Sequence, residues 1–203
     1  MQLIGLLDSP FVRRTAISLR LLGLPFEHRP LSVFRNFDVV HAINPLVKVP
    51  TLVCDDGFVL VDSTLIIDYA ETLANRRLMP GAPEQHRQAL RWIGVALVAA
   101  EKAVQIFYEH KREADRQDPG WTSRISGQLR DACALLEQEL PDGSENVWLF
   151  GDALTEADIT LAVAWGFVQL VAADVVPEAN YPKLAAFAAR AESLPEFLAF
   201  PIG

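Results

Sequence analysis

The sequence contains little cysteine and little histidine. Its 203 residues include two cysteines, Cys54 and Cys133, which are too few for a disulfide framework and do not form a C-x-x-C pair. This scarcity excludes a disulfide-stapled secreted domain and favours a reducing compartment. Four histidines are scattered along the chain without metal-ligand spacing, so we expect no metal site.

Positive charge and long apolar runs are also lacking. The net charge is -8, and phosphate backbones repel such a chain, which argues against nucleic acid as a partner. The longest apolar run, residues 159–173, is interrupted by polar residues and is shorter than the roughly 18 residues of a membrane span. It predicts a helix buried on all sides. Because the first residues do not have the pattern of a signal peptide either, we expect a cytoplasmic protein with no membrane partner.

Apolar residues make up 51% of the chain, enough for a sizeable core, and they fall into two halves of different texture. Residues 1–77 alternate short apolar runs with short helical patterns, whereas residues 84–203 have helical patterns almost throughout. Residues 78–83 contain two prolines and a glycine, which predict a linker or a sharp turn. We therefore expect an α/β domain over residues 1–77 and an all-helical domain over residues 84–203.

The first half has the element order of a thioredoxin-like domain. Pro10 after Ser9 predicts the start of a helix and Gly23 its end. Asp56-Gly57 between two apolar runs predicts a hairpin turn. The predicted order is a strand over residues 2–7, a helix over 10–23, a strand over 26–31, a helix over 37–43, a hairpin over 49–60 and a helix over 63–75.

The second half is predicted to open with a long helix over residues 84–115, broken by Asp118-Pro119-Gly120. A second helix is expected to run to Leu140 and to stop at Pro141-Asp142-Gly143, and a final one to cover residues 182–193. The apolar residues of the long helix recur at steps of three and four, which places them on one face. That face consists of Leu90, Ile93, Leu97, Ala100, Val104 and Phe107.

A further helix is predicted to begin at Thr155. Asp158 stands at the third helical position, where Glu or Gln usually completes a capping box, and the shorter carboxylate can substitute. Leu154 and Ile159 flank the pair as a hydrophobic staple does.

Ser9 is the first candidate for chemistry. A Ser-Pro pair at a strand–helix junction is, by itself, an ordinary helix cap. Its hydroxyl could instead donate a hydrogen bond to an anion, which a helix N-terminus also favours. Lowering the pKa of a bound thiol by about two units from about 8.5 takes roughly 2.7 kcal/mol, which a charge-assisted hydrogen bond and a helix dipole could supply.

Two other segments are candidate binding positions. Val49-Pro50 is either a proline that opens an edge strand or a cis peptide that exposes the Val49 backbone to an extended peptide ligand. Ser63 is either an ordinary cap or part of a helix start whose free amides hold a carboxylate, because no Glu or Gln follows at Ile66. Asp62 could then hold an ammonium, so that the pair would suit the zwitterionic end of an amino acid.

These segments, in this order, resemble the glutathione transferase family. The matching residues are SPFVR at 9–13, NPLVKVP at 44–50 and Asp62-Ser63, and the linker, the helical second half and residues 155–159 fit as well. The resemblance spans nearly the whole chain and is closest to serine-type bacterial and plant-like members. It implies a thioredoxin-like domain that binds glutathione as co-substrate, followed by an all-α domain.

The resemblance also implies roles for individual residues in the glutathione site. Ser9 would donate to the glutathione sulfur, and Val49, beside a cis Pro50, would pair through its backbone with the cysteinyl unit. Asp62 and Ser63 would hold the γ-glutamyl group.

Further roles follow for the rest of the ligand. Lys48 is the candidate for the glycine carboxylate, and Arg35 could assist it. Thr155 and Asp158 would be structural, as would Pro50. A pocket for the electrophile between the domains would be lined by Phe11, Tyr108 and Lys111.

Conjugation of the glutathione thiolate to small hydrophobic electrophiles is the leading function. Glutathione-dependent peroxide reduction is an alternative that would use the same thiolate. A non-catalytic glutathione-binding module is the third hypothesis, because a fold does not establish activity. Thiol–disulfide exchange is disfavoured, since Ser9 stands where that chemistry needs a cysteine. Isomerisation of a dicarboxylic acid is disfavoured by the missing Ser-x-Cys start. The resemblance implies a homodimer formed by the helix after Ser63 and the long helix from Glu84.

Overall fold

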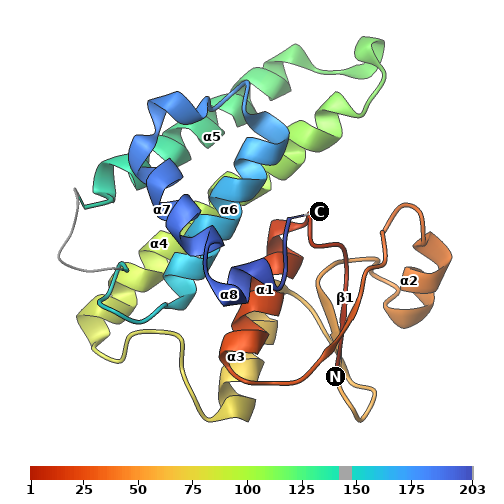
Figure 1. Ribbon diagram of the computed structural model, residues 1–203. Helices are drawn as coiled ribbons and strands as arrows, with labels where there is room; N and C mark the ends of the chain where they lie inside the picture. The colour runs from red at the N-terminus through yellow and green to blue at the C-terminus, as the bar shows by residue number, and fades with distance from the viewer. Residues whose placement is uncertain (142–147, 203) are drawn as a thin grey trace. The chain divides into compact units, whose positions relative to one another are not determined.

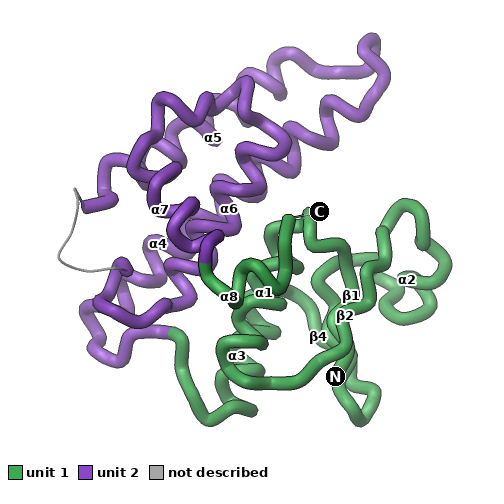
Figure 2. The backbone as a smooth tube through the Cα atoms, viewed as in Figure 1, with its two compact units in different colours: residues 1–78, 194–203 green, residues 79–193 purple. Residues whose placement is uncertain are grey.

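The computed structural model describes residues 1–141 and 148–202 (Figure 1). They form two compact units (Figure 2): unit 1 contains residues 1–78 and the segment from Leu194 onward, and unit 2 contains residues 79–193. The chain passes from unit 1 to unit 2 at the start of the segment predicted as a linker. It then returns to unit 1 near its end, a feature that the expected division of the chain does not include.

Unit 1 contains a four-stranded mixed sheet whose strands, in spatial order, are β2 (Glu27–Arg29), β1 (Gln2–Ile4), β3 (Thr51–Val53) and β4 (Val59–Leu60). β1 runs parallel to β2 and antiparallel to β3, and β4 completes a hairpin with β3. Leu3 and Leu52 lie opposite each other in the two central strands, and both are fully buried. The mixed sheet with its helices confirms the predicted thioredoxin-like fold.

The helices of unit 1 are α1 (Pro10–Leu21), α2 (Phe37–Ile43), α3 (Ser63–Ala74) and α8 (Pro195–Leu198). α1 and α3 pack against each other. α2 has the predicted bounds, and α1 ends just before Gly23, which has the left-handed φ of +73° that a glycine stop requires.

β1 is shorter than its apolar run predicts. The strand ends at Ile4 because Gly5 turns the chain with φ +137°, and Ser9 then donates its amide to the Leu6 carbonyl at 3.2 Å. A Cβ on Gly5 would lie 2.4 Å from Val12 Cγ2 and 3.1 Å from Val49 Cβ. Gly5 therefore allows the start of α1 and the segment before β3 to approach the end of β1 closely.

The C-terminal segment packs onto α1 through α8 (Figure 1). Arg13, fully buried in α1, donates Nε to the Phe200 carbonyl at 2.7 Å and lies over the Phe197 ring at 5.6 Å. The Phe200 ring stacks on Phe26 at 5.7 Å. These contacts make the segment part of the core of unit 1.

Unit 2 is helical, with α4 (Pro83–His110), α5 (Pro119–Glu139), α6 (Glu156–Ala172), α7 (Pro182–Glu192) and two 3-10 turns, η1 (Ala114–Arg116) and η2 (Glu178–Asn180). α6 packs against both α4 and α7. It is buried along most of its length, which confirms the prediction for the long apolar run. Among the described residues no helix is long and apolar enough to cross a membrane.

Only part of the predicted apolar face of α4 is buried, namely Ile93 and Ala100. Leu90 is 54% exposed, and Leu97, Val104 and Phe107 are only partly buried. The small side chains of the buried face allow close contact with α6, and this contact, rather than hydrophobicity alone, decides which face turns inward. The buried face consists of Ala89, Ile93, Ala96, Ala99, Ala100, Ala103 and Ile106.

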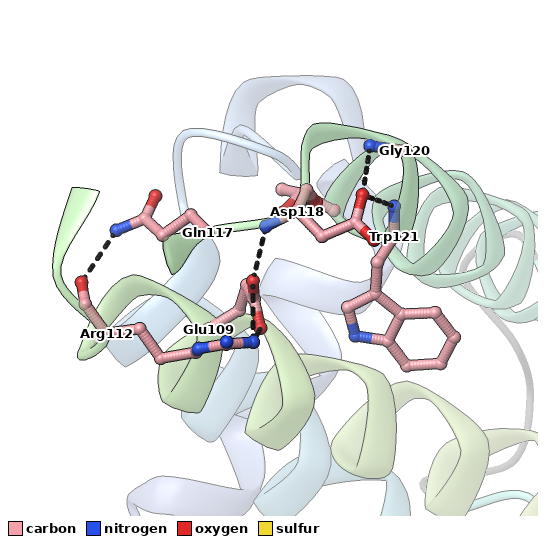
Figure 3. Close-up of polar contacts among 7 residues, drawn as sticks. Glu109, Arg112, Gln117, Asp118, Gly120 and Trp121 are labelled. Atoms are coloured by element: carbon pink, nitrogen blue, oxygen red, sulfur yellow. Dashed lines mark hydrogen bonds and ion pairs between the residues drawn. The ribbon is translucent and has the colours of Figure 1, made fainter. Parts of the chain in front are cut away.

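α4 ends at His110 and not at Asp115 as predicted, because the chain turns into α5 around Glu109 (Figure 3). The buried Glu109 carboxylate accepts the Asp118 amide at 2.7 Å and pairs with Arg112 at 3.2 Å. Asp118 in turn caps α5 by accepting the amides of Gly120 and Trp121. The predicted stop of α5 at residues 141–143 lies mostly outside the described residues.

The start of α6 confirms the predicted capping box. Asp158 Oδ2 accepts both the amide and the hydroxyl of Thr155, at 2.8 and 2.5 Å, and Oδ1 accepts the Leu149 amide at 2.8 Å. Burial raises the pKa of the Asp158 carboxyl, and these hydrogen bonds oppose the shift. The cap is internal to unit 2.

Candidate functional site

Ser9 lies at the turn from β1 into α1, where it is the N-cap of the helix. Its hydroxyl accepts the Val12 amide at 3.5 Å, a contact at the long limit for a hydrogen bond. The side chain is half-buried. Ser9 therefore combines the ordinary cap position with a weakly engaged hydroxyl at a helix N-terminus.

The Val49–Pro50 peptide is cis, as the second of the two interpretations of this dipeptide requires. Among the described residues, neither the amide nor the carbonyl of Val49 makes a hydrogen bond, although β3 begins two residues later. The Val49 side chain lies next to Gly5 at the end of β1. An unpaired backbone therefore borders the sheet close to the start of α1.

Asn44, which the sequence analysis treated only as part of a motif, holds this segment in place. It is buried, donates Nδ2 to the Thr51 hydroxyl at 2.9 Å and accepts the Leu46 amide at 3.0 Å. Thr51 Oγ1 donates to the Lys48 carbonyl at 2.6 Å. The side chain of Asn44 thus bridges the two ends of the loop that presents Val49.

The expectation of free amides at the start of α3 is wrong for Thr64 and Leu65. Asp62, not Ser63, is the N-cap, and its Oδ1 accepts the amides of Thr64 at 2.9 Å and Leu65 at 3.3 Å. The absence of an acid at Ile66 did not leave these amides open, because an aspartate at the N-cap reaches them itself. Ser63 is the first residue of the helix.

Arg14 of α1 contacts the same helix start. Its guanidinium Nη1 donates to Ser63 Oγ at 2.9 Å and to Thr64 Oγ1 at 3.1 Å. Arg14 is 1% exposed and Ser63 is 3% exposed. The sequence analysis did not predict this contact of Arg14, because a residue in the middle of a predicted helix carries no local signal of the helix that it will contact.

The two basic candidates are exposed. Lys48 lies in the loop before Val49, and Arg35 lies in the loop before α2, whose backbone is held by the Ser32 hydroxyl. Within residues 1–141 and 148–202, neither side chain makes a hydrogen bond or ion pair.

The three residues predicted to line an electrophile pocket lie in both units. Phe11 is half-buried in the first turn of α1 in unit 1. Tyr108 and Lys111 lie at the end of α4 in unit 2, where both contact the Phe107 ring, at 5.7 Å between rings and 5.0 Å from the Lys111 ammonium. Phe107, a member of the predicted apolar face of the long helix, is only partly buried.

Neither cysteine lies at the start of α1. Cys133 is buried in α5, where burial raises the pKa of its thiol to about 12, which makes it a poor nucleophile. Cys54 follows β3, next to Tyr69, and its proximity raises the pKa of the Tyr69 hydroxyl. The described residues include no cluster of His, Cys, Asp and Glu that could hold a metal ion.

Comparison with known proteins assigns both parts of the chain to one family. Residues 3–78 match the glutathione S-transferase N-terminal domain, and residues 119–190 match the glutathione S-transferase C-terminal domain. The GST-like protein YibF of Escherichia coli is 28% identical over 169 residues, which cover 83% of this chain and 82% of YibF.

Two crystal structures extend the similarity to the fold of the whole chain. A glutathione S-transferase of Methylobacterium radiotolerans, in complex with glutathione sulfonate, is 26% identical and superimposes with a TM-score of 0.89 over 98% of this chain and 93% of that one. A glutathione transferase family member of Pseudomonas fluorescens Pf-5, with bound glutathione, is 25% identical with a TM-score of 0.84 over 100% and 98% of the two chains. The chain therefore belongs to the glutathione S-transferase family.

Proposed function

We propose that this protein binds glutathione in unit 1 and conjugates its thiolate to small hydrophobic electrophiles. The observation that carries the proposal is the unpaired Val49 backbone, beside a cis proline and close to the helix that Ser9 begins. An extended peptide can add to such a backbone as a strand adds to a sheet edge. The glutathione and glutathione sulfonate bound by the two related structures support this choice of peptide.

Ser9 is the proposed catalytic residue. With glutathione paired to Val49, the Ser9 hydroxyl donates to the sulfur, and the N-terminus of α1 adds a favourable dipole. Both stabilise the thiolate relative to the thiol and lower the thiol pKa. The Val12 amide uses only the hydroxyl oxygen as an acceptor, so the hydroxyl hydrogen is available for this role.

The two ends of glutathione are assigned to polar groups of opposite character. Asp62 and Ser63 receive the γ-glutamyl group, with the exposed Asp62 carboxylate toward the ammonium. Lys48, assisted by Arg35, receives the glycine carboxylate. Phe11, Tyr108 and Lys111 are the proposed contacts of the electrophile.

We also propose that the protein is a homodimer. α3 carries Leu65, Tyr69 and Leu73 at steps of four residues, so they share one face, and all three are exposed together with Phe58 of the β3–β4 hairpin. An apolar stripe of this kind on the surface favours a second copy as its cover. Replacing Leu65 and Leu73 by Glu should convert the dimer to a monomer in analytical ultracentrifugation, and a wild-type monomer would refute the proposal.

Calorimetric titration of glutathione tests the binding, and turnover with chlorodinitrobenzene tests the chemistry, since the carbon–sulfur bond formed releases chloride. Binding with turnover supports a transferase, and turnover only with cumene hydroperoxide supports a peroxidase. Binding with neither activity supports a non-catalytic module. Absence of binding at millimolar glutathione contradicts the proposal as a whole.

A further inference from the structure

Ser63 has a buried hydroxyl that accepts a hydrogen bond but does not donate one among the described residues. Its oxygen accepts from Arg14, and no group among the described residues accepts its hydrogen. A buried donor without an acceptor costs free energy, so the hydroxyl is a candidate for completion by a ligand.

Arg14 determines which way this hydroxyl faces. A guanidinium can only donate hydrogen bonds, so the Ser63 oxygen must act as the acceptor in their contact, and its hydrogen must point elsewhere. The same contact orients Thr64. A Ser63 hydroxyl without Arg14 could turn its hydrogen inward and offer an oxygen to the ligand instead.

We propose that Arg14 is a positioning residue that makes Ser63 an obligate donor and thereby selects the α-carboxylate of the γ-glutamyl group. The proposal rests on glutathione binding as proposed above. The neighbouring Asp62 supplies an acceptor for the ammonium of the same group. Only its Oδ1 is engaged by the helix amides, and its side chain is exposed. The two residues together select a zwitterion, which a neutral or singly charged end group does not match.

The test pairs protein variants with ligands that lack one charged group. γ-Aminobutyryl-cysteinylglycine lacks the α-carboxylate of glutathione and keeps the amine, whereas glutaryl-cysteinylglycine lacks the amine and keeps the carboxylate. Calorimetry measures all three ligands with wild type, with Arg14→Met and with Arg20→Met, a control on the exposed face of the same helix.

We expect Arg14→Met to weaken the binding of glutathione and of glutaryl-cysteinylglycine about tenfold. The affinity for γ-aminobutyryl-cysteinylglycine should change less than about twofold. Arg20→Met should leave all three unchanged. Equal weakening of all three ligands by Arg14→Met would show that Arg14 only supports the fold, and would overturn the proposal. If wild type binds no glutathione, the proposed function itself fails, and this result can be told apart from a failure of the Arg14 proposal alone.

Arg14→Met removes a buried group, so a second comparison covers the case in which it does not fold. Arg14→Lys keeps a side chain that can only donate hydrogen bonds. This variant should therefore bind glutathione more weakly than wild type but more tightly than Ser63→Ala does. In a Ser63→Ala background, Arg14→Lys should cause no further loss for glutathione, because the oriented hydroxyl is already gone. Additive losses would contradict the coupling and overturn the proposal.

Discussion

The starts of α3 and α6 have similar polar residues but differ in how many of their polar atoms make hydrogen bonds. At α6, both oxygens of Asp158 are engaged, and the acid is fully buried. At α3, the exposed Asp62 uses one oxygen for two amides, and the hydrogen of Ser63 has no acceptor among the described residues. A saturated cap contributes to stability, whereas a cap with open polar groups can also bind a ligand.

Replacing Asp158 by Ala should have the largest effect. It leaves the amides of Leu149 and Thr155 without partners inside unit 2, and we expect the free energy of unfolding to fall by about 3 kcal/mol. Urea denaturation measures the change, and Asp152→Ala, at an exposed neighbouring position, is the matched control. A loss equal to that of the control would show that the cap is not what stabilises α6.

Ser63→Ala should show the reverse pattern at α3. We expect glutathione binding to weaken about tenfold, because one donor to the carboxylate is lost. The free energy of unfolding should change by less than about 1 kcal/mol, since Thr64 still accepts from Arg14. Titration and urea denaturation of the same preparation separate the two effects, and Thr155→Ala should lose stability without changing affinity.

Ser9→Ala extends the comparison to a third helix start. The weak cap at α1 should contribute little stability, and its main effect should be on the ligand: the pKa of the bound glutathione thiol should rise by about one unit. Thiolate absorbance against pH measures this directly. An unchanged thiol pKa would remove Ser9 from the chemistry.

The smallest expected effect is the pH dependence of the α6 cap. Because the pKa of Asp158 is raised above its ordinary value of 3.8, ionisation costs the folded state more than the unfolded state. Its contribution is therefore complete below pH 3.8 and is lost as pH rises through the folded-state pKa. The stability difference between wild type and Asp158→Asn should shrink over that range, and a difference that grows with pH would contradict the direction of the shift.

Local patterns predicted much of the fold correctly. The bounds of α2, the Asp-Gly hairpin, the glycine stop of α1 and the Thr155–Asp158 box all depend on contacts within a few residues, which the sequence displays directly. The buried face of α4 was not predicted, because burial there follows the fit of alanines against α6. Hydrophobicity along one helix does not contain that information.

The candidate site divides in the same way. The order of Ser9, Val49-Pro50 and Asp62-Ser63 was sufficient to indicate the family. The cap at α3 was assigned to the wrong residue, and Arg14, Gly5 and Asn44 were missed as supports, because each acts on a segment distant in sequence.

The sequence by itself therefore determined most of the secondary structure, the division into an α/β half and a helical half, and the order of the candidate binding segments, since these follow from local propensity and short-range capping. Only the tertiary structure decided that residues after Leu194 return to α1, that alanines form the buried face of α4 and that a buried arginine orients Ser63. These features depend on contacts between segments far apart in the chain, where the free energy of packing and of buried hydrogen bonds is settled by geometry.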